Sequence, residues 1–195
     1  MILKRAFYDR DTVQVSRELL GKLLVHGDTS GMIVETEAYL GGDDLAAHSA
    51  AGITPRTRVI FGPPGHAYVY LSYGMHDCLN IVVDHEGSAG CVLIRALQPV
   101  GGLEIMRTRR PKAKSDRDLT SGPGKLTRAL AITREHNGID VTRGSLRIES
   151  FQGAGDFQID VTPRIGISKA IDWPLRFLIR GNRWVSQTRL TPVAR

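Results

Sequence analysis

The chain has little of what marks a secreted or membrane-bound protein. It contains only two cysteines, Cys78 and Cys91, which form no CxxC pair. We therefore expect two buried thiols in a reducing compartment rather than a disulfide. No apolar run approaches the roughly 20 residues that a membrane-spanning helix needs. Residues 1–10 are charged and lack an apolar core, unlike a signal peptide. These absences predict a cytosolic or nuclear protein.

The sequence also lacks the spacing of a metal site. Its histidines are scattered, and no HExxH pattern is present. The one local group of candidate ligands consists of Glu35, Glu37, Asp43, Asp44 and His48. A single histidine among scattered carboxylates is a weak metal signal. We therefore predict that the protein uses no metal, and keep a metal-dependent hydrolase as an alternative.

The remaining composition is that of a folded protein with a basic surface. Hydrophobic residues make up 42% of the 195 positions and charged residues 24%, which predicts one globular domain, residues 1–195. The net charge is +6, with 26 Lys and Arg against 20 Asp and Glu. This balance favours a polyanionic partner, although the same excess also serves solubility alone. Seven basic residues lie in the last part of the chain: Arg164, Lys169, Arg176, Arg180, Arg183, Arg189 and Arg195.

Strand-like and helix-like segments follow one another without regular alternation. Helical spacing covers 11–20, 102–110 and 126–132, with Asp11 or Thr12 as the expected N-cap of the first segment, and a charged loop is expected through Asp118. Strands are predicted at 23–26, 31–40, 67–71, 79–83, 91–97, 146–150 and 158–161. Because strands cluster while helices lie at intervals, the α+β class is predicted.

The most informative motif lies on the predicted strand 31–40. Glu35, Glu37 and Tyr39 are two positions apart, so their side chains share one face of a strand. The opposite face is mostly small and apolar. A carboxylate beside an aromatic ring and His48 suits a pocket that holds a flat ring and activates a water. The alternative is a surface carboxylate on a half-exposed strand.

Tyrosines are concentrated in and after the next predicted strand. Tyr68 and Tyr70 share a face, whereas Tyr73 lies beside Gly74 at a turn and is expected to point outward. An aromatic ring at such a tip suits insertion between stacked bases. The alternative is that Tyr70 belongs to the core and Tyr73 packs on a neighbouring loop.

Residues 121–125 resemble the start of a helix that offers free N–H groups to a phosphate. Ser121, Gly122 and Lys125 are the candidate contacts, but no Walker A pattern is present. Nucleotide hydrolysis is therefore not supported, and a plain junction between loop and helix is an equal alternative.

Taken together, these motifs resemble the alkyladenine (3-methyladenine) DNA glycosylase family. The matching blocks keep their order over nearly the whole chain: VETEAY (34–39), AHS (47–49), TPR (54–56), YVY (68–70), YGM (73–75), Cys78, Asn80, LIRAL (93–97), SGP (121–123) and PRIG (163–166). The resemblance implies a single α+β domain with a curved antiparallel sheet and surrounding helices. It also implies no cofactor, and double-stranded DNA with damaged purines as the partner of a monomeric enzyme.

The resemblance also implies a role for each site residue. Glu37 would activate the water that attacks the sugar C1′, and Arg95 would hold that carboxylate and water. The implied base-binding residues are Tyr39, His48, Tyr70 and Asn80; Asn80 would crowd the purine 2-position and so reject guanine. Tyr73 would fill the gap left by the flipped base, with Met75 beside it. Apart from the resemblance, the helix start at 121–125 and the basic C-terminal part of the chain make Ser121, Gly122, Lys125 and Arg164 the expected phosphate contacts.

Three further expectations complete the sequence reading. No lysine lies in the pocket blocks between Glu35 and Asn80, so a Schiff-base lyase step has no visible nucleophile and a monofunctional glycosylase is predicted. Residues 84–88 depart from the family pattern beside the strand of Asn80. The short N-terminus suggests a compact bacterial type acting in the cytoplasm, at the nucleoid. A non-catalytic DNA- or RNA-binding module remains the main alternative, although a pocket carboxylate would not serve it.

Overall fold

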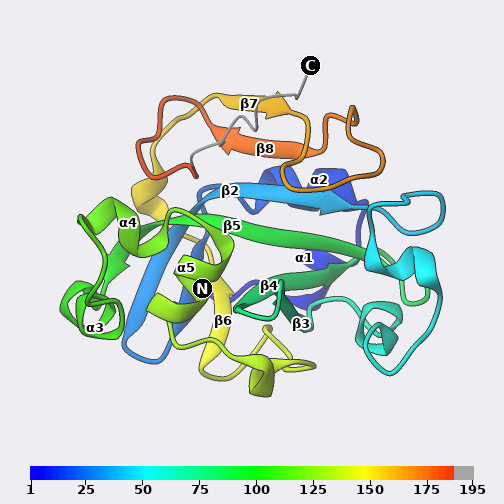
Figure 1. Ribbon diagram of the computed structural model, residues 1–195, viewed down its shortest axis with the longest axis horizontal. Helices are drawn as coiled ribbons and strands as arrows, with labels where there is room; N and C mark the ends of the chain where they lie inside the picture. The colour runs from blue at the N-terminus through cyan, green and yellow to red at the C-terminus, as the bar shows by residue number, and fades with distance from the viewer. Residues whose placement is uncertain (187–195) are drawn as a thin grey trace.

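An eight-stranded antiparallel sheet forms the centre of the computed structural model, which describes residues 1–186 (Figure 1). The strands are β1 (Leu23–His26), β2 (Thr29–Tyr39), β3 (Ala67–Ser72), β4 (His76–Val83), β5 (Gly90–Gly101), β6 (Leu146–Glu149), β7 (Ile159–Thr162) and β8 (Arg176–Ile179). Six of them follow the order β3-β4-β5-β2-β1-β6, while β8 pairs with β2 and with β7.

Short helices surround this sheet. They are α1 (Arg5–Tyr8), α2 (Thr12–Glu18), α3 (Leu103–Arg109), α4 (Asp116–Thr120) and α5 (Pro123–Ala129), with 3-10 helices at His48–Ala51, Arg58–Phe61, Arg134–His136 and Gln152–Ala154. The α+β class predicted from the sequence is confirmed. Within residues 1–186, no helix has the length and apolar character needed to cross a bilayer.

The long strand β2 organises the sheet because three strands pair with it. β5 follows one edge, whereas β1 pairs with its first residues and β8 with Glu35, Thr36 and Glu37 further along. The β2–β5 register shifts between Ile33 and Glu35. Such bulges bend a strand and increase its twist. A second shift lies between Glu35 and Thr36, so the irregular part of β2 surrounds Glu35 and ends before Glu37.

The two faces of β2 have the opposite characters that the alternation predicted. Val34, Thr36 and Ala38 are fully buried, and the Thr36 hydroxyl donates to the carbonyl oxygen of Ser16 in α2 at 2.9 Å. α2 begins where the Asp11 side chain accepts the Gln14 N–H at 2.8 Å, a standard N-cap. Because this face is occupied by packing, Glu35, Glu37 and Tyr39 lie on the other.

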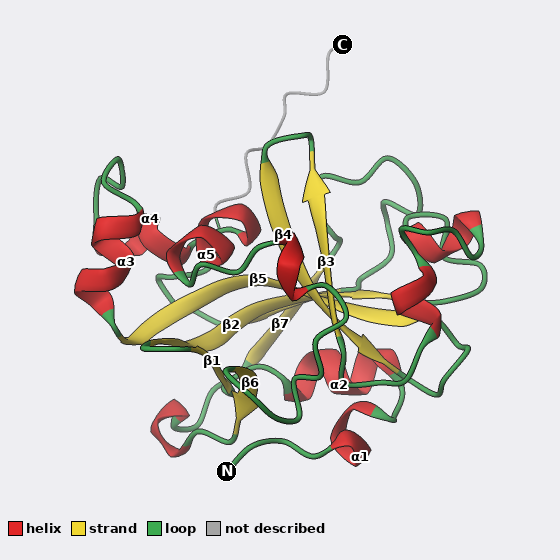
Figure 2. Cartoon of the chain, turned by 90° about the horizontal axis from the view of Figure 1, so that it is seen from below, coloured by secondary structure: helices red, strands yellow, loops and turns green. Residues whose placement is uncertain are grey.

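The β3–β4 hairpin projects from the sheet on the side away from α1 and α2 (Figure 2). Ser72 pairs with His76, and the turn between them places Tyr73 at φ +50° and Gly74 at φ +68°. A left-handed conformation is uncommon for a non-glycine residue and often marks a functional site. The tip is therefore held in a defined, outward geometry.

One segment differs from the sequence prediction. The expected charged loop through Asp118 instead contains helix α4, which begins at Asp116. Leu119 and Thr120 are buried, and the Thr120 hydroxyl donates to the Leu97 carbonyl oxygen of β5 at 2.7 Å. Burial of Leu119 and the hydrogen bond of Thr120 hold this charged segment against the sheet as a helix. Its charged composition alone did not indicate a helix.

Candidate active site

The carboxylate of Glu37 is fully buried and has three donors. Its Oε1 accepts the backbone N–H of Ile165 at 2.8 Å, and its Oε2 accepts the Tyr39 hydroxyl at 2.9 Å and Nη1 of Arg95 at 3.1 Å. A carboxylate offers about four acceptor positions. One position on Glu37 therefore remains for a further donor such as water.

Glu35 lies on the same face but has a different environment. Its oxygens accept Nε of Arg95 at 3.1 Å, Nε of Arg176 at 2.7 Å, and the hydroxyl and N–H of Ser186 at 2.8 and 2.7 Å. Three of these donors share Oε1 and one reaches Oε2, so Glu35 is held by one donor more than Glu37. We conclude that Glu35 anchors the guanidinium of Arg95, which in turn contacts Glu37.

The charge of Arg95 is retained despite its burial. Burial alone would lower its pKa, but the carboxylates of Glu37 and Glu35 outweigh that effect and raise the pKa above its usual value. Two buried carboxylates and two guanidinium groups, those of Arg95 and Arg176, thus balance each other beside the pocket.

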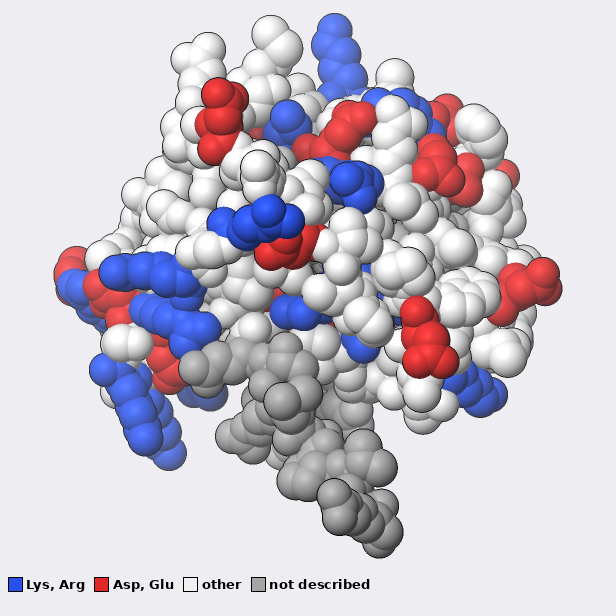
Figure 3. All heavy atoms as spheres, turned by 90° about the horizontal axis from the view of Figure 1, so that it is seen from above, with Lys and Arg blue, Asp and Glu red and all other residues white. Residues whose placement is uncertain are grey.

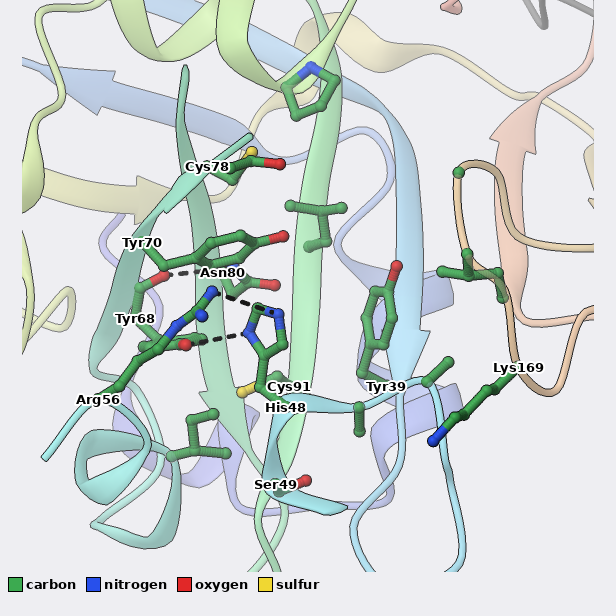
Figure 4. Close-up of a pocket in the computed structure, with 18 of the residues that line it drawn as sticks. Tyr39, His48, Ser49, Arg56, Tyr68, Tyr70, Cys78, Asn80, Cys91 and Lys169 are labelled. Carbon is green, nitrogen blue, oxygen red and sulfur yellow. Dashed lines mark hydrogen bonds between the residues drawn. The ribbon is translucent and has the colours of Figure 1, made fainter. Parts of the chain in front are cut away.

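A cavity of about 620 Å³ opens in front of these residues, within the usual range for small-molecule sites. Tyr39 stands on one side, with Tyr70 and Tyr68 of β3 on the other and His48 between them (Figure 4). The Tyr68 and Tyr70 rings are stacked with centroids 5.5 Å apart. The His48 ring meets the edge of Tyr70 at 4.5 Å. Such walls suit a flat aromatic ligand.

Glu37 itself does not line this cavity, but all three of its donors, Tyr39, Arg95 and Ile165, do. The carboxylate therefore lies directly behind the pocket wall. A water that reaches Glu37 would come from the cavity, between those three residues.

The hydrogen bonds of His48 define its tautomer. Nη2 of Arg56 lies 3.4 Å from Nε2 of His48, and the Tyr68 hydroxyl lies 3.0 Å from Nδ1. Because a guanidinium only donates, Nε2 is the acceptor and Nδ1 carries the proton. Burial, with a smaller effect of the Arg56 charge, lowers the pKa of His48, so the ring is neutral at physiological pH.

Asn80 and the two cysteines complete the floor of the cavity. The Asn80 amide donates to the Tyr68 carbonyl oxygen at 3.3 Å. Cys78 and Cys91 are free and buried, which confirms the prediction made from their spacing. Burial raises the pKa of both thiols, so they remain protonated. The missed contributors to the wall are Tyr68, Arg56 and Ile165.

The hairpin tip carries the predicted exposed residues. The Tyr73 side chain is 82% exposed and Met75 72% exposed. Tyr73 also lines the mouth of the cavity, and its hydroxyl is 3.5 Å from the Gly166 carbonyl oxygen. Tyr73 thus stands free of the core, as expected for a residue that inserts into DNA, although that insertion stays a prediction.

The predicted phosphate contacts have unequal environments. α5 begins at Pro123 after Gly122, so its first helical residue offers no N–H. Ser121 is buried, and the Lys125 ammonium pairs with Asp118. For Ser121, Gly122 and Lys125 the role stays a prediction. For Arg164 it is incompatible with the structure, because its side chain is fully buried against Asp44.

The basic C-terminal segment is less available than its sequence suggested. Arg176 is buried with Glu35, and Arg180 pairs with Asp160 at 2.6 Å. Arg189 and Arg195 lie outside the described residues. Lys and Arg instead gather at the side of the molecule where α3 and α4 lie (Figure 3). The basic residues in the sequence of this region are Arg107, Arg109, Arg110, Lys112, Lys114 and Arg117. Acidic residues lie among them, and Arg107 pairs with Glu104 and Asp116.

The acidic cluster considered for a metal does not converge. Within residues 1–186, no group of three His, Cys, Asp or Glu side chains is arranged to hold an ion. Asp44 binds Arg164, Glu37 binds Arg95, and His48 binds Tyr68. These three candidate ligands thus bind separate partners, and Asp43 is exposed.

Similarity to known proteins covers most of the chain. Residues 6–183 match the model of a family described as methylpurine-DNA glycosylase. A protein of Methanoculleus marisnigri is 52% identical over 193 residues, which cover 96% of this chain and 100% of that protein. Proteins of Koribacter versatilis and Legionella pneumophila are 50% and 47% identical, over 96% and 95% of this chain and 94% and 98% of theirs. All three carry the name "Putative 3-methyladenine DNA glycosylase".

Proposed function

The chain belongs to the methylpurine-DNA glycosylase family, and we propose that it releases methylated and deaminated purines, 3-methyladenine and hypoxanthine among them, from double-stranded DNA. Membership makes it a hydrolytic N-glycosylase that acts on DNA in repair. We further propose that it works as a monomer at the nucleoid and needs no cofactor.

The observation that carries the proposal is the incompletely satisfied carboxylate of Glu37 behind an aromatic pocket. The purine nucleotide rotates out of the duplex, and its base enters between Tyr39 and the Tyr70–His48 wall. A water bound to the open acceptor position of Glu37 attacks the sugar C1′. The C1′–N bond breaks with its electrons on the purine, and the water proton passes to Glu37. The carboxylate also stabilises the oxocarbenium-like sugar.

Arg95 keeps this carboxylate in place. Its Nη1 contacts Glu37 while its Nε is anchored by Glu35. A guanidinium held at both ends loses little freedom when the substrate binds. We assign it the role of orienting the carboxylate and the water. Arg95 itself lines the cavity, so a bound water can contact both groups.

Incubation of the protein with duplexes carrying one hypoxanthine, one methylated purine or no lesion tests the proposal. Alkali-labile sites should appear at the lesion and not in the undamaged duplex. A complete absence of alkali-labile sites on both damaged duplexes would refute it. A non-catalytic binding module would bind the duplexes and give this negative result.

A single hydrolytic step should leave the strand intact until alkali is added. The pocket blocks 35–80 contain no lysine, but the structure adds Lys169 from the loop after Ile165 at the cavity wall. Lys169 is exposed and lies beyond Tyr39, on the side opposite to His48 and the Tyr68–Tyr70 wall (Figure 4). Borohydride should therefore trap no covalent adduct with the hypoxanthine duplex. An adduct that disappears in Lys169→Gln would instead indicate a lyase.

Asn80→Ser should relax the exclusion of guanine more than it changes hypoxanthine release. Asn80 is buried in the cavity floor, and a shorter side chain leaves room for the 2-amino group that guanine carries and hypoxanthine lacks. We expect guanine release from a G·T duplex to rise by about tenfold, as one lost steric contact typically allows. Guanine release no higher than in the wild type would show that Asn80 is not the gate.

Chelation should have no effect. EDTA is expected to leave the single-turnover rate unchanged, because the proposed general base is a carboxylate, and Glu37 and Asp44 bind guanidinium groups or backbone donors. Activity lost in EDTA and restored by Zn²⁺ would revive the metal-dependent hydrolase.

Affinity for undamaged duplex should fall as salt increases, with each phosphate contact adding about 0.9 to the slope of log affinity against log salt. Lys169 is exposed at the rim of the cavity, so Lys169→Gln should reduce the slope by about 0.9. Lys4→Gln, on the side of α1, is the matched control and should not change it. Equal slopes in both variants would exclude Lys169 from the contact.

A further inference from the structure

The strongest feature outside the reacting groups is a buried ion pair that joins two loops at the site. Nη1 and Nη2 of Arg164 donate to the two carboxylate oxygens of Asp44 at 2.6 and 2.8 Å. Both side chains are fully buried. The geometry is bidentate, which fixes the plane of the guanidinium as well as its position.

The same two side chains also hold the end of β2. Nη1 of Arg164 donates to the Ala38 carbonyl oxygen at 3.0 Å, between the positions of Glu37 and Tyr39. Asp44 accepts the N–H of Leu40 at 2.9 Å and the N–H of Ala46 at 3.1 Å. The pair thus connects β2, the loop that leads to His48, and the loop that contains Arg164.

Arg164 is adjacent to one donor of the Glu37 carboxylate and contacts another. The residue after Arg164 is Ile165, whose N–H donates to Glu37 at 2.8 Å. The Arg164 guanidinium also lies over the Tyr39 ring, 4.7 Å from its centroid, and Tyr39 is another donor to Glu37. Two of the three donors to the carboxylate are therefore in contact with, or adjacent to, Arg164.

Stability alone is a poor reason for this pair. Removing two charges from water is costly, and apolar replacements of buried pairs are often neutral or stabilising. Nε of Arg164 has no hydrogen-bond partner among the described residues, which adds to that cost. A buried pair of this kind is understandable if its role is to fix the positions of the groups that it contacts.

We propose that Asp44 and Arg164 are positioning residues that set the Ile165 N–H and the Tyr39 ring against Glu37. They act through Glu37 and touch neither DNA nor the reacting atoms, so the inference rests on the proposed role of Glu37. Displacing a catalytic group by about 1 Å can cost on the order of 10²-fold in rate. Loss of the pair should therefore reduce the chemical step and leave DNA binding nearly unchanged.

The double variant Asp44→Asn/Arg164→Gln tests this without leaving a buried charge. Single-turnover release of 7-methylguanine, a cationic base that departs readily, should slow by about 10- to 100-fold. Duplex affinity, measured by fluorescence anisotropy, should stay within about threefold. Arg164→Lys keeps the charge but loses the planar fork, and should recover only part of the rate. If the double variant does not fold, the rate and duplex affinity of Arg164→Lys test the proposal in its place.

Repeating the double substitution in a Glu37→Gln protein distinguishes a positioning role from a general loss of structure. In Glu37→Gln, adding Asp44→Asn/Arg164→Gln should reduce the residual rate by less than about twofold, because residues that act through one group are not additive. Asp140→Asn is the control: Asp140 pairs with Arg5 at 2.7 Å, lies outside the cavity wall, and should keep the wild-type rate.

The outcomes distinguish the two proposals. A folded double variant with the wild-type rate would overturn the positioning role, as would an equal rate loss in both backgrounds. If Glu37→Gln alone retains the wild-type rate, the proposed function of Glu37 fails instead.

Discussion

Glu37→Gln is expected to slow single-turnover base release by about 10²- to 10⁴-fold, the usual worth of a general base. Affinity for a damaged duplex should stay the same or increase, because the change removes a negative charge near the DNA phosphates. Glu37 is fully buried, keeps an open acceptor position, and has three donors, Tyr39, Arg95 and Ile165, that all line the cavity. Arg176 and Ser186, which donate to Glu35, do not line it.

The substitution will also reduce stability, and the measurement must separate the two effects. The amide of glutamine would point its NH₂ group toward the N–H of Ile165 or toward Arg95, and only the Tyr39 hydroxyl can turn to accept it. Thermal unfolding therefore accompanies the rate measurement, with the exposed Glu86→Gln as the control for charge. A rate within about threefold of the wild type in a folded Glu37→Gln protein would exclude general-base catalysis by Glu37.

Tyr73→Ala is expected to weaken excision from a paired duplex by roughly 5- to 150-fold, equivalent to the 1–3 kcal/mol that one stacked aromatic contributes. On a single strand carrying the same lesion the loss should be small, because no partner base has to be displaced. The reason is the position of Tyr73 at the tip of the projecting hairpin, 82% exposed and in a left-handed conformation.

Tyr73→Phe is the matched control for this prediction. It keeps the ring and removes only the hydroxyl, whose contact with Gly166 is long at 3.5 Å, so it should behave as the wild type does. Rates on duplex and single strand are compared under single-turnover conditions. Equal losses on both substrates in Tyr73→Ala would show that the residue packs within the protein rather than inserting into DNA.

The local parts of the site could be predicted from the sequence because strand periodicity is strict. Alternation over 34–40 placed Glu37 and Tyr39 on one face and Ala38 on the other, as the structure has them. The turn at Gly74 likewise predicted an exposed Tyr73. These features depend only on neighbouring residues, so tertiary packing could not reverse them.

Features that depend on distant partners could not be predicted. Arg164 was expected at a phosphate because it belongs to the basic C-terminal part of the chain, yet it lies buried against Asp44, which precedes it by a long stretch of chain. The donor from Ile165 is a backbone N–H, so no side-chain pattern indicates it.

Chromatography of free purines released from methylated duplex DNA tests the proposed reaction in one measurement. Wild-type protein should release 3-methyladenine and leave one alkali-labile site for each base released, with strands intact before alkali. Folded Glu37→Gln should release it at least about 10²-fold more slowly under the same conditions. Failure of the wild type to release any methylated purine, or equal release by Glu37→Gln, would contradict hydrolysis by a water activated at Glu37.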